Sequence, residues 1–413
     1  EGCQNSAFGF QAMKCNTTGD NNTGLGQNAL FANTTANSNT AVGRAALQNS
    51  ITGGNNTAVG CGASTNATSA DGNTAIGVQA LRDNETGDNN VAIGLNALLE
   101  NTTQRNTAVG MSAMICNTTG QQNVAVGYFT LDENTTGGCN IALGGGLGRN
   151  STGSGNIGIG NSALTNNTTC SDNVAVGRAA AQETSSAHGI VAIGALALCK
   201  NTSGDNNTAV GFCSLVCNTT GASNVAVGLN ALDANTTGSR NTSVGFASLG
   251  SNNGAGAQNT AIGYEAGINN TTGVNNIFVG DSAGADAMIN VTTASQQIVL
   301  GTNAHTNATI KIDWTVTSDL RDKTEIADVP CGLDFVNQIT PIKYKFKTSR
   351  EDETPIGRAR YGFKAQEILE LEGDNPVLVN NDDEENLKLT GAYLVPVLVN
   401  AIKELKAEID ELK

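Results

Sequence analysis

The sequence predicts a mainly β protein, in which a long repetitive β-solenoid precedes a small α/β domain. The first observation is a glycine-centred motif that recurs about every seventeen residues from Gly9 to Gly301. The second is the composition: 50 of the 413 residues are glycine, 4% are aromatic and 14% are charged, which does not describe an ordinary globular core. The third is a sharp change of composition near Ser318. These observations separate a shaft, residues 1–301, from a domain, residues 318–413.

The repeat is strict in its spacing. The glycine that closes each "AVG"-like triplet is followed by the next after 17 residues, apart from two intervals of 16, one of 18 and a last one of 21. Such regularity indicates a structural repeat. The marker glycines are Gly9, Gly26, Gly43, Gly60, Gly77, Gly94, Gly110, Gly127, Gly144, Gly160, Gly177, Gly194, Gly211, Gly228, Gly245, Gly263, Gly280 and Gly301.

Each repeat is predicted to form one coil of the solenoid. A typical unit, "NVAVGLNALDANTTGSR" at 224–240, holds one short strand, a second apolar pair and an Asn-Thr-Gly turn. Large and small residues alternate in the strand, as expected where side chains point to two faces. Seventeen residues are too few for two useful helices, and Asn, Gly and Thr are poor helix formers. Parallel pairing at about 4.8 Å per coil predicts a shaft of roughly 80 Å.

The shaft is expected to be a homotrimer. Each coil buries only a few small apolar side chains, which return little free energy against the entropy of ordering seventeen residues, so backbone ladders and neighbouring chains must contribute. This argument requires association without fixing the number three. The "NTAVGxxAL" units resemble the head repeats of trimeric autotransporter adhesins and the shaft repeats of viral fibres. The resemblance implies the trimer.

Two features of the repeat leave alternatives. Asn-x-Thr/Ser sequons would be a glycan coat on a secreted protein, but the same turn recurs in every coil, where Asn and Thr suit turns and ladders, and we favour the turn role. These sequons include Asn16, Asn33, Asn101, Asn117, Asn134, Asn218 and Asn235. Aromatic residues after the marker glycine could stack on sugar rings. We favour the alternative that they fill the core or contact other chains. They are Phe10, Tyr128, Phe212, Phe246 and Tyr264.

Several classes of function are disfavoured. The net charge of -15, the pI near 4.5 and the lack of a Lys/Arg-rich run in the array argue against nucleic acid. The longest apolar stretch, 189–199, is shorter than the roughly 18 residues that span a bilayer, so no membrane insertion is expected. No pair of carboxylates stands out for cleaving a polysaccharide. No C-x-x-C occurs, and His188 and His305 lie far apart, so we expect no metal and no cofactor.

The ten cysteines leave one pairing open. Cys199 and Cys217 are 18 residues apart, almost one repeat, so stacking could bring them together as a disulfide. We favour the alternative that the cysteines are small apolar residues, buried as free thiols. The chain also begins "EGCQNSAFG", in the middle of a repeat, which suggests a fragment of a longer chain.

The last quarter of the chain reads as a separate domain. Residues 1–310 contain 8 Lys/Arg and 16 Asp/Glu of the 22 and 37 in the chain, which leaves 14 and 21 for the last 103 residues. The connector 302–317 alternates like a strand in "ATIKIDWTVTSD". We expect a helix at 332–339 and a strand at 341–347, then "RYGFKAQEILEL" at 360–371 within a mixed α/β domain.

A final helix is predicted at 392–413. Its apolar residues are spaced 4, 3, 4 and 3 apart, which is the pattern of a short coiled-coil seam. Because fewer than three heptads are present, an amphipathic helix that lies on its own domain explains the spacing equally well. The five residues are Leu398, Ile402, Leu405, Ile409 and Leu412.

The segment "TSDLRDKTEI" at 317–326 carries the candidate chemistry. Its motif, Ser-Asp-x-Arg-x-Lys-x-x-Ile, is followed by "GLDFVNQITPIKYKFK", "YGFKAQEI" and "LVPVLVNAIKELKAEIDELK". In this order the motifs resemble the endosialidase-type intramolecular chaperone and autoprotease domain, found at the C-terminus of phage tail fibres and tailspikes. Asp322 departs from the apolar residue that many members carry. The motif residues are Ser318, Asp319, Arg321, Lys323 and Ile326.

The resemblance implies a domain that trimerises, starts the winding of the fibre and then cuts itself off. By position, Ser318 is the nucleophile, Lys323 is its base and Thr317–Ser318 is the scissile bond. A lysine serves as a base only where burial or a nearby cation, here Arg321, lowers its pKa from about 10.4. No activity on an external substrate is expected. Without the resemblance, Ser318 and Asp319 would more simply cap a helix or turn, with Arg321 and Lys323 solvated.

The preferred hypothesis is a phage-type host-attachment fibre on the virion surface, assembled in the host cytoplasm. Its partners would be two further copies of the chain, a glycan or protein receptor on the host cell, and the rest of the virion through a part preceding residue 1. A cell-surface trimeric adhesin and a polysaccharide-degrading tailspike are the alternatives.

Overall fold

The chain forms two compact units. The computed structural model describes residues 2–253, 256–286, 289–302, 304–305, 318–347, 350–374, 376–381 and 387–413. The first unit contains the described residues up to Ala285 together with Ile289–Thr302, and the second contains Asp286 and the described residues beyond Thr302. Most of the connector 302–317 lies outside the described residues, and with it residues 308–317 of the expected strand 308–319.

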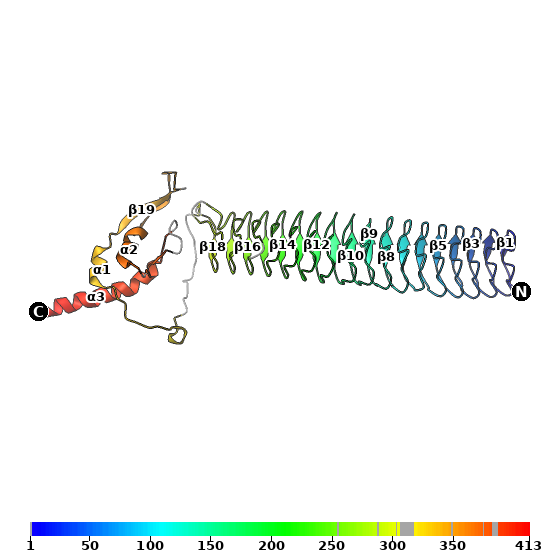
Figure 1. Cartoon of the computed structure of the whole chain (residues 1–413), viewed down its shortest axis with the longest axis horizontal. Helices are drawn as coiled ribbons and strands as arrows, with labels where there is room; N and C mark the ends of the chain where they lie inside the picture. The colour runs from blue at the N-terminus through cyan, green and yellow to red at the C-terminus, as the bar shows by residue number, and fades with distance from the viewer. Residues whose placement is uncertain are drawn as a thin grey trace. The chain divides into compact units, whose positions relative to one another are not determined.

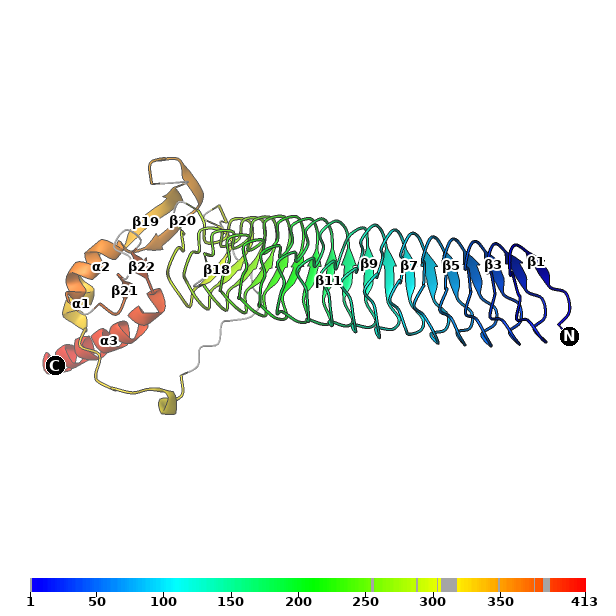
Figure 2. The ribbon, with the colours of Figure 1, turned by 45° about the vertical axis from the view of Figure 1, so that its right-hand side comes forward.

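The first unit is a parallel β-solenoid with one three-residue strand per coil, so the predicted fold is confirmed. Each strand pairs in parallel with the next along the chain, as in Ala41 opposite Ala58 and Ala58 opposite Ala75. Figure 2 shows the strand arrows in one row along the coils. The strands are β1 (Ser6–Phe8), β2 (Thr23–Leu25), β3 (Thr40–Val42), β4 (Thr57–Val59), β5 (Thr74–Ile76), β6 (Val91–Ile93), β7 (Thr107–Val109), β8 (Val124–Val126), β9 (Ile141–Leu143), β10 (Ile157–Ile159), β11 (Val174–Val176), β12 (Val191–Ile193), β13 (Thr208–Val210), β14 (Val225–Val227), β15 (Thr242–Val244), β16 (Thr260–Ile262), β17 (Ile277–Val279) and β18 (Ile298–Leu300).

The interior of the solenoid is built from small and medium apolar side chains. The middle residue of most strands is an alanine with no exposed surface, such as Ala58 or Ala209. A second row of leucines, such as Leu47 and Leu98, is also fully buried, although each has a positive φ near 50°. A left-handed backbone costs a leucine about 1–2 kcal/mol. The row therefore persists because contacts with the coils on both sides hold it in place.

Two ladders of buried asparagines run through the coils. In the first, the amides of several turn Asn residues donate to the Asn one coil earlier, as Asn134 does to Asn117 at 2.6 Å and Asn218 does to Asn201 at 2.8 Å. In the second, the Asn that precedes most strands accepts a backbone N–H from the next coil, as Asn56 does from Asn73 at 2.9 Å. Of the predicted sequon residues, Asn33, Asn101, Asn117, Asn134, Asn218 and Asn235 have no exposed surface. The structure thus supports the turn role and not a glycan coat at these positions.

The outward side chains of the strands form an apolar sheet face. The first and third residues of every strand β1–β18 are Ser, Thr, Val, Ile, Leu or Phe, and none is charged. Ile76, Ile193 and Ile262 on this face are between 39% and 46% exposed. The aromatics after the marker glycine are exposed too, from 40% at Phe246 to 69% at Phe10, so they do not fill the core of their own chain.

The cysteines differ from both expectations. Cys199 and Cys217 are free thiols, so the disulfide between them is not formed. The alternative of buried cysteines holds in the described chain for Cys170 alone, because the other nine are half-buried or exposed. Cys199 and Cys217 do not stack on each other, because they are 18 residues apart and the coils here repeat every 17. The position one coil before Cys217 is Lys200, whose N–H bonds the Val216 carbonyl.

The second unit is a small α/β domain. It contains a hairpin of β19 (Ile342–Lys347) and β20 (Pro355–Gly362), and a short pair β21 (Val379–Asn380) and β22 (Lys388–Leu389). Its helices are the 3-10 turns η1 (Leu320–Asp322) and η2 (Gly391–Tyr393), α1 (Leu333–Gln338), α2 (Ala365–Glu372) and α3 (Leu394–Glu411), labelled in part in Figure 1. The predicted helix at 332–339, the strand at 341–347 and the final helix are confirmed within two residues at each end.

A small core holds this domain together. Its buried residues come from α1, α2, the β21 region and α3: Phe335, Ile368, Leu378, Val379, Leu394 and Val397. On α3 the residues that face this core are Leu394, Val397 and Ala401. The five residues of the predicted seam are exposed, with Ile402 at 66%. The helix therefore lies on its own domain through one face and presents the seam on another. In the described chain no helix is both long and apolar enough to cross a bilayer.

Candidate functional site

The candidate site is a tight turn that begins at Ser318, in the second unit. Asp319 is the N-cap of η1: its backbone is extended, and its Oδ1 accepts the Arg321 N–H at 2.9 Å. Aspartate is among the preferred N-cap residues because its carboxylate satisfies an N–H that has no partner in the helix. The Lys323 N–H bonds the Leu320 carbonyl and ends the turn. The chain therefore folds back on itself between Ser318 and Lys323.

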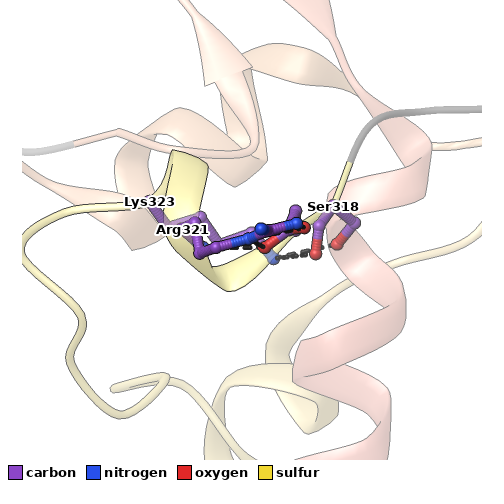
Figure 3. A network of polar contacts seen from close by, with 4 residues as sticks. Ser318, Arg321 and Lys323 are labelled. Carbon is purple, nitrogen blue, oxygen red and sulfur yellow. Dashed lines mark hydrogen bonds and ion pairs between the residues drawn. The ribbon is translucent and has the colours of Figure 1, made fainter.

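This turn brings the two predicted catalytic side chains together. Lys323 Nζ lies 2.8 Å from Ser318 Oγ and 3.2 Å from the Ser318 carbonyl oxygen. Figure 3 shows the lysine reaching across the turn to the serine. The first distance is within the hydrogen-bond reach expected between a nucleophile and its base. Thr317, on the other side of the proposed scissile bond, lies outside the described residues.

Arg321 is bound to Asp319 and not to the serine. Its Nη2 lies 2.6 Å from Asp319 Oδ2, and its Nε lies 3.1 Å from each carboxylate oxygen. The hydrogen bond from Arg321 lowers the pKa of Asp319, and the reciprocal bond raises the pKa of Arg321. The positive charge of Arg321 is thus compensated within the turn.

The turn is open to solvent in the single chain. Ser318 and Lys323 are both exposed, and the apolar side chains of Leu320 and Ile326 are each 68% exposed. Asp322, the departure from the family pattern, is also exposed. Of the two causes that can lower the pKa of a lysine, burial is therefore not supplied by this chain alone.

Residues 324–332, which are exposed as far as Pro330, join this turn to α1, and we call them the strap. Asn400 of α3 bonds the strap at the Cys331 carbonyl, and Glu404 of α3 bonds the Leu333 N–H where the strap passes into α1. Sequence reasoning missed both residues. The available signal was a single asparagine inside the apolar run "LVPVLVNAI", since polar residues in such a run often bond another segment.

A cavity of about 730 Å³ lies beside the strap, lined in part by Val329, Cys331, Leu378 and Val397. At its edge the Glu372 carboxylate accepts the N–H groups of Val377, Leu378 and Val379 at 2.6 to 3.0 Å, which fixes the loop before β21. Burial raises the pKa of the Cys331 thiol, so this cysteine is a weak nucleophile. Across the described ranges no group of three or more His, Cys, Asp or Glu side chains is placed to hold a metal ion.

Comparison with known proteins bears on the second unit. Among curated proteins, none matches this sequence significantly. Residues 318–378 match the family described as chaperone of endosialidase, and the match begins at Ser318. It includes the turn, the strap, α1, the hairpin and α2, and it ends before α3. The chain thus joins a β-solenoid of 17-residue repeats to a C-terminal domain that is similar, over these residues, to the chaperone of endosialidase.

Proposed function

We propose that this protein is a homotrimeric fibre whose C-terminal domain acts as an intramolecular chaperone and cuts the chain between Thr317 and Ser318. One observation carries the proposal. Lys323 Nζ lies 2.8 Å from Ser318 Oγ, at the point where the match to the chaperone of endosialidase begins. A serine next to the bond to be cut, with a lysine in hydrogen-bond contact, has the two groups that self-cleavage requires.

The chemistry is a transfer of the acyl group followed by hydrolysis. Ser318 Oγ forms a bond to the carbonyl carbon of Thr317, and the C–N bond to the Ser318 nitrogen breaks. The proton of Oγ passes by way of Lys323 Nζ to the departing nitrogen. Water then attacks the ester, which leaves a carboxylate on Thr317 and both the hydroxyl and a free amine on Ser318. Neither step needs a metal or an external reactant other than water.

Cleavage is expected only in the assembled protein. A lysine accepts a proton where burial or a nearby cation lowers its pKa, and in the single chain Arg321 is paired while Lys323 is exposed. Neighbouring copies that cover Leu320 and Ile326 would bury the turn and exclude bulk water from it. Association would then precede cleavage, because the chaperone domain is cut off only after the copies have met.

The solenoid offers a surface for the same association. Its sheet face carries no charged residue in the outward positions of β1–β18, in a chain with 59 charged residues in total, 22 basic and 37 acidic. An uncharged apolar face of this length is typical of an interface between subunits and not of a surface exposed to water. The exposed seam of α3 offers a second such surface.

We further propose that the fibre is a phage-type tail fibre, carried on the virion surface and assembled in the host cytoplasm, that attaches to a glycan or protein on the host. The resemblance of the C-terminal motifs to phage fibres and tailspikes supports this reading. If the fibre instead degrades a polysaccharide, incubation with capsular glycan will release oligosaccharides. If it is a cell-surface adhesin, antibody labelling will mark cells and not virus particles. We expect labelled particles and intact glycan.

The test of self-cleavage is a denaturing gel of the full chain beside Ser318→Ala and Lys323→Ala. The wild type is expected to give fragments 1–317 and 318–413, and both variants to remain intact. An Asp322→Ala variant, in the same turn but outside the dyad, controls for folding and should be cut. An intact wild-type chain that has formed trimers would remove the self-cleavage proposal. Cleavage in either dyad variant would remove the assignment of the dyad.

A further inference from the structure

The strap is held to the rest of its domain at one end. Residues 323–330 are all exposed, and in Figures 1 and 2 this segment runs from η1 to α1 outside the packed helices. The hydrogen bonds that side chains elsewhere in the described chain make to it come from α3, at Val329 and Cys331, close to the start of α1. Because the strap leads to Ser318 and Lys323, the contacts that set the direction in which it leaves the domain also limit where these two residues can lie.

Asn400 makes the first part of this attachment. Its Nδ2 donates to the Cys331 carbonyl at 3.0 Å, to Glu404 Oε1 at 3.2 Å and, at the limit of contact, to the Val329 carbonyl at 3.4 Å. The Asn400 side chain is half-buried, and its bond to the Cys331 carbonyl is partly shielded from water, whereas the bond to Val329 is exposed. Removing the donor would leave two backbone acceptors of the strap without their partner.

Glu404 makes the second part. Its Oε2 accepts the Leu333 N–H at 2.6 Å. This N–H is one of the first of α1, and the N-cap residue Gly332 has no side chain that could satisfy it. A Cβ at Gly332 would overlap the Glu404 carboxylate, so the glycine leaves room for the capping group to come from another helix. The strap therefore ends, and α1 begins, at a point that α3 determines.

The same helix carries the surface for association. Asn400 and Glu404 lie on α3 at the edge of the face that packs on the domain, which includes Val397 and Ala401, on the side away from the exposed seam, which includes Ile402. An 18-residue helix moves as one rigid element. When three seams meet, the positions of all three straps are fixed with them, provided that the attachment through Asn400 and Glu404 is intact.

We propose that Asn400 and Glu404 are positioning residues that transmit assembly of α3 to the cleavage turn, by fixing the strap so that Ser318 and Lys323 of one copy meet a neighbouring copy. This inference rests on the proposed self-cleavage. It assigns to the pair a function in cleavage that is separate from assembly, because neither residue belongs to the seam or contacts the dyad. Loss of the pair should leave trimers that are cut slowly.

The experiment compares full chains that carry Asn400→Asp, Glu404→Gln or Glu404→Ala. Asn400→Asp keeps the shape of the side chain but removes its donors and places a second carboxylate beside Glu404. Glu404→Gln keeps one acceptor oxygen, whereas Glu404→Ala keeps none. Glu408→Ala, an exposed glutamate one turn later on α3, is the matched control. The cleavage rate is followed on denaturing gels, and the trimer fraction is measured by light scattering in a Ser318→Ala background.

We expect Asn400→Asp and Glu404→Ala to slow cleavage by roughly tenfold or more, because each removes hydrogen bonds that involve a charged or buried partner. Glu404→Gln should be faster than Glu404→Ala, and Glu408→Ala should match the wild type. The trimer fraction should be the same in all. Gly332→Ala, which displaces the Glu404 carboxylate without changing either residue, should also slow cleavage.

The possible failures are distinct. A wild type that trimerises and is not cut removes the proposed function and this inference with it. A wild type that is cut, beside variants cut at the same rate, overturns the inference alone. Variants that lose the trimer in parallel with cleavage would place the pair in assembly and also overturn it. Equal rates for Glu404→Gln and Glu404→Ala would exclude Glu404 as the acceptor that matters.

Discussion

The solenoid and the C-terminal domain differ in where their stabilising contacts come from. In the solenoid a typical side-chain hydrogen bond joins residues 17 apart, as between Asn117 and Asn134. In the domain the bonds that fix the strap join residues 69 to 71 apart, as between Cys331 and Asn400. Each coil is thus completed by its two neighbours, whereas the domain needs distant parts of the chain to meet.

This difference indicates the order in which the two parts of such a chain can fold. A coil that adds to an existing coil forms its ladders as it orders, which offsets the entropy cost, but the first coil has no template, because none of its ladders yet exists. A domain with its own core and an exposed apolar seam can form first and gather copies of the chain. Under the proposed function, the domain starts the association through its exposed seam and the solenoid continues it through its exposed sheet face.

The largest expected effect tests the dependence of the domain on other copies. Replacing Ile402 and Leu405 together by Asp places carboxylates in the seam. Burying each of these side chains contributes about 1.5–3 kcal/mol, so we expect the association to weaken by roughly 100-fold or more and cleavage to stop. Sedimentation and a denaturing gel measure the two outcomes. Lys403→Asp with Lys406→Asp adds the same groups outside the seam and should keep both. Trimers in the seam variant would mean that the solenoid associates without the domain.

The second effect tests the dependence of each coil on the next. Gly211 has a φ of 136°, and a Cβ there would overlap the Gly228 carbonyl oxygen. Gly211→Ala is expected to cost several kcal/mol, since an unfavourable backbone region alone costs about 1–3 kcal/mol. Limited proteolysis should then cut the chain near this coil. Gly148→Ala is the control, because its Cβ would meet its nearest neighbour, Asp132 Oδ1, at 3.7 Å. If Gly211→Ala resists proteolysis like the wild type, coil stacking tolerates the added Cβ and the prediction is wrong.

The third effect repairs an interrupted ladder. At Thr184 the first Asn ladder is broken, and Asn167 Oδ1 and Thr184 Oγ1 are both buried without a partner in the described chain. Thr184→Asn would supply an amide donor to Asn167 and an acceptor for Asn201. We expect stabilisation by about 1 kcal/mol, the usual net contribution of one hydrogen bond, seen as a higher melting temperature. Thr220→Asn, on the exposed side of a turn, should change little. A lower melting temperature for Thr184→Asn would contradict the ladder account.

The smallest effect concerns a half-buried carboxylate on the solenoid. Burial raises the pKa of Asp132 above its ordinary value of 3.8. The folded state therefore binds this proton more tightly than the unfolded state, so the contribution of Asp132 to stability is present below pH 3.8 and is lost as the pH rises through the raised value. Asp132→Asn should stabilise the solenoid at pH 7 and lose this advantage on acidification. Thermal melts at several pH values test it, with the exposed Asp172→Asn as control. A constant difference would exclude burial as the cause.

Much of the fold could be predicted because it repeats. The period of the glycines indicated one coil per repeat, and the alternation in the strand indicated which residues face inward; Ala58 and Ala209 are buried as this pattern requires. Within the candidate site, the motif also placed Ser318 and Lys323 close in sequence, and a turn capped by Asp319 then brings them together. Short-range order of this kind depends on neighbours in the chain, which the sequence displays directly.

Other features depend on contacts that no local pattern displays. Phe278 occupies the place of an inward alanine, and its ring fills the space left by Gly267 and Gly284, which replace leucines of the second row. Each of these three residues is an irregularity when read alone. Three other features also depend on which atoms meet in space. They are the absence of a bond between Cys199 and Cys217, the pairing of Arg321 with Asp319, and the attachment of the strap by α3.

By itself the sequence determined the coil, its length, its inward and outward residues and the order of the units, because a repeated residue pattern leaves one periodic way to pair and bury it. The tertiary structure decided which apolar faces stay exposed, and through which residues the final helix holds the strap that leads to Ser318 and Lys323. The physical reason is that burial and long-range hydrogen bonds belong to pairs of segments, and the geometry of a pair is fixed only when both segments are in place.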